Sequence, residues 1–130
     1  MNTIAHGVDI VEVARIARML EEHGERFRER CFTEAECAYA EAGGQVRAQR
    51  YGVRFAAKEA VLKAIGTGWQ YGIAWTDVEV VRSAEGVPGV ALRGEAARRA
   101  AERGISGWLL SLSHTETHAM ASAIGLGREG

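Results

Sequence analysis

The stretch from Arg54 to Gly68 constrains the fold of this chain more than any other part of the sequence. Alanine, lysine, glutamate and leucine dominate it and no proline interrupts it, so it predicts a helix that ends at the glycines after Ile65. The larger apolar residues recur at spacings of three, four and seven and form one stripe, which consists of Phe55, Val61, Leu62 and Ile65. The sequence therefore predicts a central helix around which the other elements are organised.

Glu59 and Lys63 lie four residues apart on another face of the same predicted helix. This spacing is typical of an exposed ion pair, which contributes only about 0.3 kcal/mol to stability. It also places a carboxylate and an ammonium one turn apart, where both can face a charged ligand. The helix alone favours the exposed pair, and the choice depends on what the N-terminal segment places beside it.

Length and composition set the limits within which this helix is interpreted. The chain has 130 residues, 47% hydrophobic and 25% charged, which predicts one soluble domain over residues 1–130. Its formal net charge of -1 gives no overall attraction to nucleic acid. No apolar run approaches the roughly 20 residues of a membrane span and no signal-peptide pattern is present, so we expect a cytoplasmic protein without a membrane partner. We expect Cys31 and Cys37 to be reduced thiols.

The N-terminal segment from Thr3 to Val11 predicts a short strand. Its apolar residues Ile4, Val8 and Ile10 alternate with smaller ones, which places Asp9 on the face opposite the main apolar face. Aspartate is unfavourable in a strand, and here it can be presented as a ligand. The alternative is that Asp9 or the neighbouring Glu12 caps the following helix, and the residues alone leave the two interpretations equal.

The next helix is expected over Val13–His23, with helical character continuing beyond Gly24. Its predicted buried stripe consists of Val13, Ile16, Ala17 and Leu20. This segment and the residues after it contain five arginines within sixteen residues, namely Arg15, Arg18, Arg26, Arg28 and Arg30. Such a run is usually a solvated face, although together with Met19 it can also form a docking surface for an acidic helical partner.

The middle of the chain continues with helix and turn signals. Thr33 and Glu36 have the spacing of a capping box, and the short helix that they open ends at Gly43 and Gly44. Helical character returns at about Gln45 and leads into the central helix. After Gly68 the pattern becomes mostly extended. The expected elements there are a strand over 77–82, a turn over 83–89, its hairpin partner over 90–92 and a helix over 95–103.

Two more strands are expected near the C-terminus, at residues 107–114 and 118–125. The short turn between them predicts an antiparallel hairpin. The predicted fold class is therefore α+β, a small antiparallel sheet packed with helices. His114 and His118 flank this turn at a spacing found in zinc sites, but the turn separates them and no third ligand is evident, so we do not expect zinc.

Several motifs, taken together and in order, resemble the holo-acyl-carrier-protein synthases, the small 4′-phosphopantetheinyl transferases. The N-terminal motif is Gly7–Ile16, and the second motif is Arg54–Ala60 with Lys63-Ala64 and Gly66-Thr67-Gly68. Further matching segments are Phe32-Thr33 with Glu36, and Ser111–His114 with Ala119. The resemblance covers essentially the whole chain. Two positions depart from it: Val87 stands where the family often has lysine, and His118 where it often has tyrosine.

The resemblance implies a reaction and a metal ion. Members of the family transfer 4′-phosphopantetheine from coenzyme A to a serine of an apo-acyl carrier protein and release adenosine 3′,5′-bisphosphate. Asp9 and Glu59 would hold Mg²⁺, an ion that binds one or two carboxylates together with phosphate oxygens. Lys63 would reach the pyrophosphate, and Glu59 or a metal-held water would accept the serine proton. Asp9, Glu59 and Lys63 are thus the expected catalytic residues.

The same resemblance implies the binding residues and the partners. Arg54 and His114 would face the 3′-phosphate of coenzyme A, with Lys63 and Gly66 near the same ligand. The acidic carrier protein, of fatty-acid or polyketide synthesis, would dock on Arg15, Arg18, Met19 and Arg26. Members of this short type form homotrimers with active sites between subunits, so we expect the same here.

Two other classes of function compete with this interpretation. In a non-enzymatic binding module, Asp9 and Glu59 would be only caps and ion pairs, and loss of an acidic ligand or of Lys63 would be expected; all three residues are present. A different Mg²⁺-dependent phosphoryl-transfer enzyme would act on a nucleotide. No Walker-type loop or dinucleotide fingerprint supports that alternative.

Overall fold

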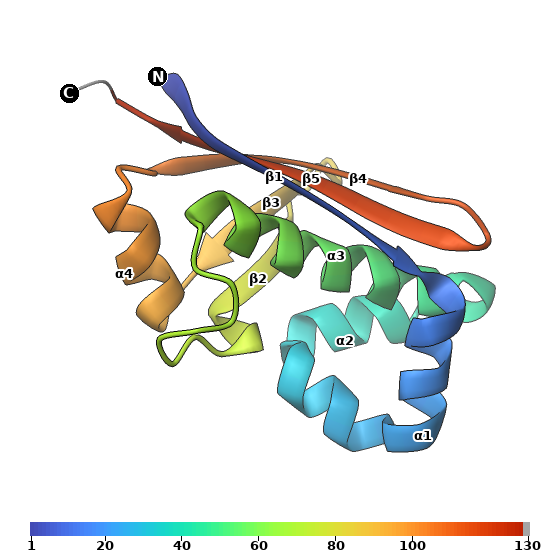
Figure 1. Ribbon diagram of the computed structural model, residues 1–130. Helices are drawn as coiled ribbons and strands as arrows, with labels where there is room; N and C mark the ends of the chain where they lie inside the picture. The colour runs from blue at the N-terminus through green and yellow to red at the C-terminus, as the bar shows by residue number, and fades with distance from the viewer. Residues whose placement is uncertain (129–130) are drawn as a thin grey trace.

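The computed structural model describes residues 1–128 and has a three-stranded sheet, a two-stranded hairpin and helices on one side of the sheet (Figure 1). The elements follow in the order β1 (Asn2–Glu12), α1 (Val13–Cys31), α2 (Glu34–Glu41), η1 (Gly44–Val46), α3 (Arg47–Ile65), η2 (Trp75–Asp77), β2 (Val78–Arg82), β3 (Pro88–Leu92), α4 (Gly94–Glu102), β4 (Gly107–His114) and β5 (His118–Gly127). This arrangement confirms the predicted α+β class. None of the helices in these residues is both long and apolar enough to cross a membrane.

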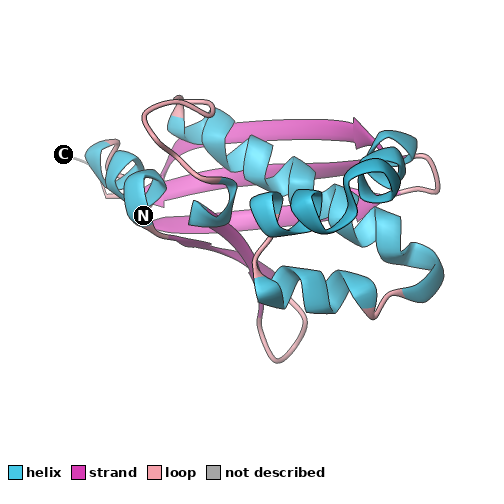
Figure 2. Ribbon diagram, turned by 90° about the horizontal axis from the view of Figure 1, so that it is seen from below, coloured by secondary structure: helices cyan, strands magenta, loops and turns pink. Residues whose placement is uncertain are grey.

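The main sheet has the antiparallel strand order β1-β5-β4, and α3 lies across one of its faces. The view from below shows the helices in front of the long strands, so no helix of residues 1–128 lies on the opposite face of the sheet (Figure 2). The hairpins predicted near residues 83–89 and 115–117 are both present, as β2–β3 and β4–β5. Apart from Glu59 and Lys63, every residue of α3 from Tyr51 onward is buried.

Small residues allow α3 to approach the sheet closely. The inner face of β5 carries buried Ala119, Ala121 and Ala123. On β1, a Cβ atom added to Gly7 would lie 1.9 Å from the carbonyl oxygen of Ala60 in α3. Because no side chain fits at that distance, glycine is required at this position of the strand.

The structure corrects the predicted faces of β1. Its alternation places Asp9 opposite Val8 and Ile10, as expected, but the face that packs on α3 is the one with Gly7, Asp9 and Val11. Val8 and Ile10 are 47% and 60% exposed. The prediction failed because the largest side chains were assumed to face the core, whereas the close approach of α3 accepts only small ones. As a result, Asp9 lies on the same side of the sheet as α3.

Helix α1 is longer than the predicted Val13–His23 and is interrupted at Gly24, whose φ of 40° and ψ of -115° are not helical. The buried residues of its first half include Val13, Ile16 and Leu20, as expected, but Ala17 is exposed and does not belong to the stripe. Ala17 was wrongly included because its small apolar side chain fits the pattern at the edge of the stripe. The two cysteines are free thiols, as predicted, and burial raises the pKa of Cys31 to about 11.

A buried ion pair joins the elements that pack on the outer side of α3. The capping box predicted from the sequence is present, with Thr33 N donating to Glu36 Oε1 at 2.8 Å. The same carboxylate contacts Lys58 Nζ at 2.8 Å, and its second oxygen accepts from Val80 N at 2.8 Å. Lys58 also donates to the carbonyl oxygens of Trp75, at 3.1 Å, and of Val78. One pair of side chains therefore links α2, α3, η2 and β2.

Lys58 and Glu36 are almost fully buried, so each depends on the other for its charge. Burial lowers the pKa of Lys58, and the Glu36 carboxylate partly offsets this effect. Removing one member of such a pair leaves an unpaired charge in the core, which costs far more than removing both.

We expect Lys58→Met to lower the free energy of unfolding by about 3–5 kcal/mol, because Glu36 is then buried without its partner. The double variant Glu36→Leu, Lys58→Met should recover a large part of this loss. Urea unfolding measures both, with Arg98→Met as a control that removes the exposed pair between Arg98 and Glu95 on α4 and should change stability little. Equal stability of the wild type and Lys58→Met would contradict this role of the pair.

Candidate active site

The close packing of β1 on α3 brings Asp9 to Lys63. Lys63 Nζ lies 3.0 Å from Asp9 Oδ1 and also donates to the carbonyl oxygen of Val8 at 3.0 Å. The Asp9 side chain is 17% exposed and that of Lys63 is 55% exposed, so the pair is accessible to solvent. Lys63 therefore pairs with a residue of another element rather than with Glu59, contrary to the exposed i,i+4 pair. Nor does Glu12 cap α1, since its side chain makes no capping hydrogen bond.

Glu59 is the half-buried carboxylate of the site. Burial raises its pKa above the ordinary value and the negative charge of Asp9 raises it further, while the Trp69 indole N–H and the cations Lys63 and Arg15 partly counter the change. Asp9 and Glu59, which are 50 positions apart in the sequence, thus lie close enough for their charges to repel.

Two carboxylates that repel each other next to an ammonium group form a donor set that suits a hard divalent cation. Mg²⁺ is bound in proteins by one or two carboxylates and keeps water and phosphate oxygens as its other ligands. Asp9 and Glu59 are therefore the residues that would hold it. Within residues 1–128 no group of three or more His, Cys, Asp or Glu side chains could hold a metal ion, so the other ligands of Mg²⁺ would be water and phosphate oxygens.

Beside Glu59 lies a groove of about 810 Å³, which we call the apolar groove. Its apolar lining consists of Met19, Phe27, Cys31, Phe55 and Trp75, and its charged and polar lining of Arg15, His23, Arg26, Glu29, Arg30 and Glu59. The guanidinium of Arg15 lies 5.8 Å from the centroid of the Phe55 ring.

Three of the four predicted docking residues, Arg15, Met19 and Arg26, line this groove, and Arg18 does not. Arg18 is exposed on the same helix but lies outside the groove, so the prediction for Arg18 lacks the support that the other three have. His23 was missed, and Arg30 belonged to the arginine run but was not among the four predicted docking residues. Their place in the groove depends on the break of α1 at Gly24, which the spacing of residues did not reveal.

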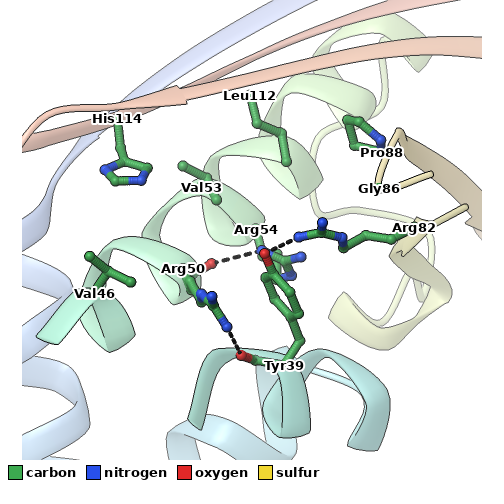
Figure 3. A pocket seen from close by; sticks show the side chains of 10 residues that line it. All are labelled: Tyr39, Val46, Arg50, Val53, Arg54, Arg82, Gly86, Pro88, Leu112 and His114. Carbon is green, nitrogen blue, oxygen red and sulfur yellow. Dashed lines mark hydrogen bonds between the residues drawn. The ribbon is translucent and has the colours of Figure 1, made fainter. Parts of the chain in front are cut away.

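A second cavity, of about 330 Å³, contains predicted coenzyme A residues Arg54 and His114. Figure 3 shows three arginines around the ring of Tyr39, with His114 of β4 pointing toward the same space. The guanidinium carbons of Arg50, Arg54 and Arg82 lie 4.1, 4.2 and 4.3 Å from the ring centroid. We call this the cationic cavity.

Hydrogen bonds hold the arginines of the cationic cavity in place. Arg50 Nη1 donates to the carbonyl oxygen of Tyr39 at 2.7 Å, and Arg82 donates to the Tyr39 hydroxyl. Arg54 is buried, burial lowers its pKa, and its Nε has no hydrogen-bond partner within the described residues. An anion entering the cavity would meet donors that are already oriented.

The sequence did not indicate Tyr39, Arg50 or Arg82 as functional residues. They come from α2, α3 and β2, and only the fold brings them together. Arg82 lines the cavity at the end of β2, whereas Val87, which stands where relatives often have lysine, does not line it and is 61% exposed. The other departure, His118, is also exposed, and its Nδ1 lies 2.9 Å from the Thr117 hydroxyl.

Gly66 ends α3 in the left-handed conformation, with a φ of 89°. Its N–H donates to the carbonyl oxygen of Leu62, and Arg103 Nη1 donates to the carbonyl oxygen of Ile65 at 2.7 Å. The left-handed conformation at the end of α3 thus explains why a glycine stands at this position. Its contact with coenzyme A remains a prediction.

The two cavities share no lining residue. Arg54 and Glu59 are five positions apart on α3, which turns their side chains to different sides of the helix. The predicted residues therefore divide into an acidic group, formed by Asp9, Glu59 and Lys63 beside the apolar groove, and a cationic group that contains Arg54 and His114.

Comparison with known proteins identifies the family and the fold of this chain. A family model described as the 4′-phosphopantetheinyl transferase superfamily matches residues 5–122. The holo-[acyl-carrier-protein] synthase of Desulforudis audaxviator is 50% identical over 123 residues, which cover 93% of this chain and 91% of that one. The one of Solibacter usitatus is 45% identical over 121 residues, covering 93% of this chain and 96% of the relative.

Solved structures agree with these relatives. The acyl carrier protein synthase of Plasmodium yoelii with ADP bound has a TM-score of 0.85 at 32% identity, over 98% of both chains. The holo-(acyl-carrier-protein) synthase of Bacillus anthracis in complex with CoA (3′,5′-ADP) has a TM-score of 0.78 at 31% identity, over 97% of this chain and 98% of that one. The class defined by fold and site is a small α+β transferase. The chain belongs to the 4′-phosphopantetheinyl transferase superfamily, and the resemblance stated from the sequence is confirmed.

We expect Glu59→Gln to stabilise the folded chain at neutral pH in the absence of divalent metal. Because the pKa of Glu59 is higher in the folded than in the unfolded state, the folded state binds this proton more tightly and ionisation lowers stability. The cost is fully present above the folded pKa, decreases as the pH falls through it, and vanishes below the unfolded value of about 4.3.

Urea unfolding in the presence of a chelator, at pH values of about 7.5 and 4, measures this difference. Glu25→Gln, which removes an exposed carboxylate outside both cavities, is the matched control. A Glu59→Gln variant that is less stable than the wild type at neutral pH would show that the carboxylate is not held at an energetic cost.

Proposed function

We propose that this chain transfers 4′-phosphopantetheine from coenzyme A to a serine of an apo-acyl carrier protein in a Mg²⁺-dependent reaction, releasing adenosine 3′,5′-bisphosphate. The observation that carries the proposal is the convergence of Asp9, Glu59 and Lys63 beside a groove that is lined by Glu59 and by three arginines. Relatives that are 41–50% identical over most of the chain and are called holo-[acyl-carrier-protein] synthases support it.

The acidic group would perform the chemistry. Mg²⁺, held by Asp9 and Glu59, would neutralise charge on the pyrophosphate oxygens, as phosphoryl transfer requires. Lys63 is exposed enough to move from Asp9 to a phosphate oxygen and supply a second positive charge. Glu59, or a water held by the metal, would accept the proton of the carrier serine.

The cationic cavity would bind the 3′-phosphate of coenzyme A. Its guanidinium groups come from three different elements and converge on one space, which suits a compact dianion better than an extended carboxylic acid. Arg54 and His114 were predicted for this role, and Arg50 and Arg82 join them.

The separation of the two groups supports an active site shared between subunits, as in the homotrimer that the family resemblance implies. A single coenzyme A needs the acidic group at its pyrophosphate and the cationic group at its 3′-phosphate, and within one chain these open on different sides of α3. The bare face of the sheet exposes Val8, Ile10, Leu109 and Met120, all between 40% and 60% accessible. Burying this apolar face against other copies would drive the assembly in which a cationic cavity and an acidic group of different subunits could serve one coenzyme A.

The apolar groove would receive the carrier protein. Its apolar lining fits the side chains of a carrier helix, and the cations Arg15 and Arg26 would attract acidic residues around them. Glu59 lines the groove, so the serine of a carrier protein bound there could lie beside this carboxylate.

A direct assay tests the proposed activity. The chain is incubated with apo-carrier protein, coenzyme A and Mg²⁺, and the carrier is weighed by mass spectrometry. We expect a gain equal to one phosphopantetheine group. Unmodified fatty-acid and polyketide carriers under conditions that modify them with a known transferase would refute the proposal.

We expect Asp9→Ala and Glu59→Gln to reduce kcat by at least about a hundredfold, because each removes a ligand of the proposed Mg²⁺. Both variants should fold, because the two carboxylates are only partly buried and removing one of them relieves their mutual repulsion. The wild type should lose activity in excess chelator and regain it with Mg²⁺ or Mn²⁺. Full turnover in chelator would end the metal hypothesis.

We expect Arg15→Glu to raise the KM for carrier protein by about tenfold at low salt, because it reverses a charge in the groove. The KM for coenzyme A should stay nearly unchanged, and added salt should reduce the difference by screening. Arg18→Glu makes the same charge change on the same helix outside the groove and should have a smaller effect. Equal effects of the two variants, or of Arg15→Glu on both substrates, would contradict docking in the groove.

A further inference from the structure

The loop after α3 places a tryptophan beside the acidic group. Trp69 stacks on Trp75 with ring centroids 3.8 Å apart and an angle of 27° between the rings. Trp75 in turn stacks on Phe55 of α3, at 4.7 Å and 29°. Phe55 and Trp75 line the apolar groove together with Glu59, so the ring stack begins at the wall of the groove that holds this carboxylate.

The polar edge of Trp69 makes no hydrogen bond of ordinary geometry within residues 1–128. Its indole Nε1 is buried and makes no hydrogen bond within the described residues, although Trp69 is only partly buried as a whole. A buried donor without an acceptor is unfavourable and rare in folded proteins, which suggests that the acceptor is supplied in another state of the site.

The carboxylate of Glu59 is the acceptor within reach. It lies near enough to the Trp69 N–H for the N–H to stabilise its charge, yet no hydrogen bond of ordinary geometry joins them. Asp9 meanwhile is held by Lys63. A carboxylate that binds a metal through one oxygen has its other oxygen free for a donor, and such a donor fixes the orientation of the ligand.

We propose that Trp69 is a positioning residue for Glu59, donating a hydrogen bond from its indole N–H to one carboxylate oxygen when Mg²⁺ binds the other. The inference rests on the proposed function, because it assigns Glu59 to the metal. The ring stack with Trp75 and Phe55 holds the indole in one plane, so the donor is in place before the metal arrives.

The indole N–H signals in a ¹H–¹⁵N NMR spectrum test this directly in the wild-type chain during a titration with MgCl₂ alone. The chain has three tryptophans, so Trp69→Phe, Trp75→Phe and Trp108→Phe assign the signals. We expect Mg²⁺ to move the Trp69 signal downfield in the wild type and to leave it in place in Glu59→Gln. A Trp69 signal that does not move when Mg²⁺ saturates the wild type would overturn the proposal.

Calorimetry adds a second readout. Phenylalanine can preserve the ring stack but has no N–H, so Trp69→Phe should weaken Mg²⁺ binding by about tenfold. Trp108→Phe is the control, because Trp108 lies on β4 and lines neither cavity. Wild-type Mg²⁺ affinity in Trp69→Phe overturns the positioning role alone. Wild-type affinity in Glu59→Gln overturns the metal site itself and, with it, this inference.

Discussion

The buried pair between Glu36 and Lys58 is the interaction on which the arrangement of this protein depends. Glu36 lies three positions before Tyr39 on α2, so the pair also fixes the position of the tyrosine around which the cationic cavity is built. Lys58 directly precedes Glu59 on α3 and binds the carbonyl oxygen of Trp75, a wall of the apolar groove. The pair contributes little net stability compared with an apolar core, but it fixes both cavities relative to one helix.

The second constraint is the close contact between α3 and the sheet. Gly7 and the alanines of β5 let the helix approach, and this proximity gives Asp9 a partner on α3. Packing α3 on one face also leaves the opposite face of the sheet with exposed Val8 and Ile10. The packing of α3 on one face of the sheet therefore produces both the acidic group and a surface suited to assembly.

Local patterns in the sequence predicted most elements and the capping box, and they singled out Asp9 and Glu59, which the fold brings close together. They failed where the outcome depends on contacts between distant segments. The faces of β1 were exchanged because the pattern gives alternation but not the space that α3 leaves. Arg82 and Tyr39 were missed because their convergence exists only in three dimensions, and nothing in the spacing of arginines separated Arg15, which lines the groove, from Arg18, which does not.

The central claim is that acidic and cationic groups of different chains serve one reaction, and mixed assemblies test it most directly. Chains with Glu59→Gln and chains with Arg82→Ala and His114→Ala, each inactive alone, are co-expressed with different tags and purified through both. In a mixed trimer one of three interfaces combines intact groups, so we predict about one third of wild-type activity. Activity no higher than that of the separate variants would contradict the account.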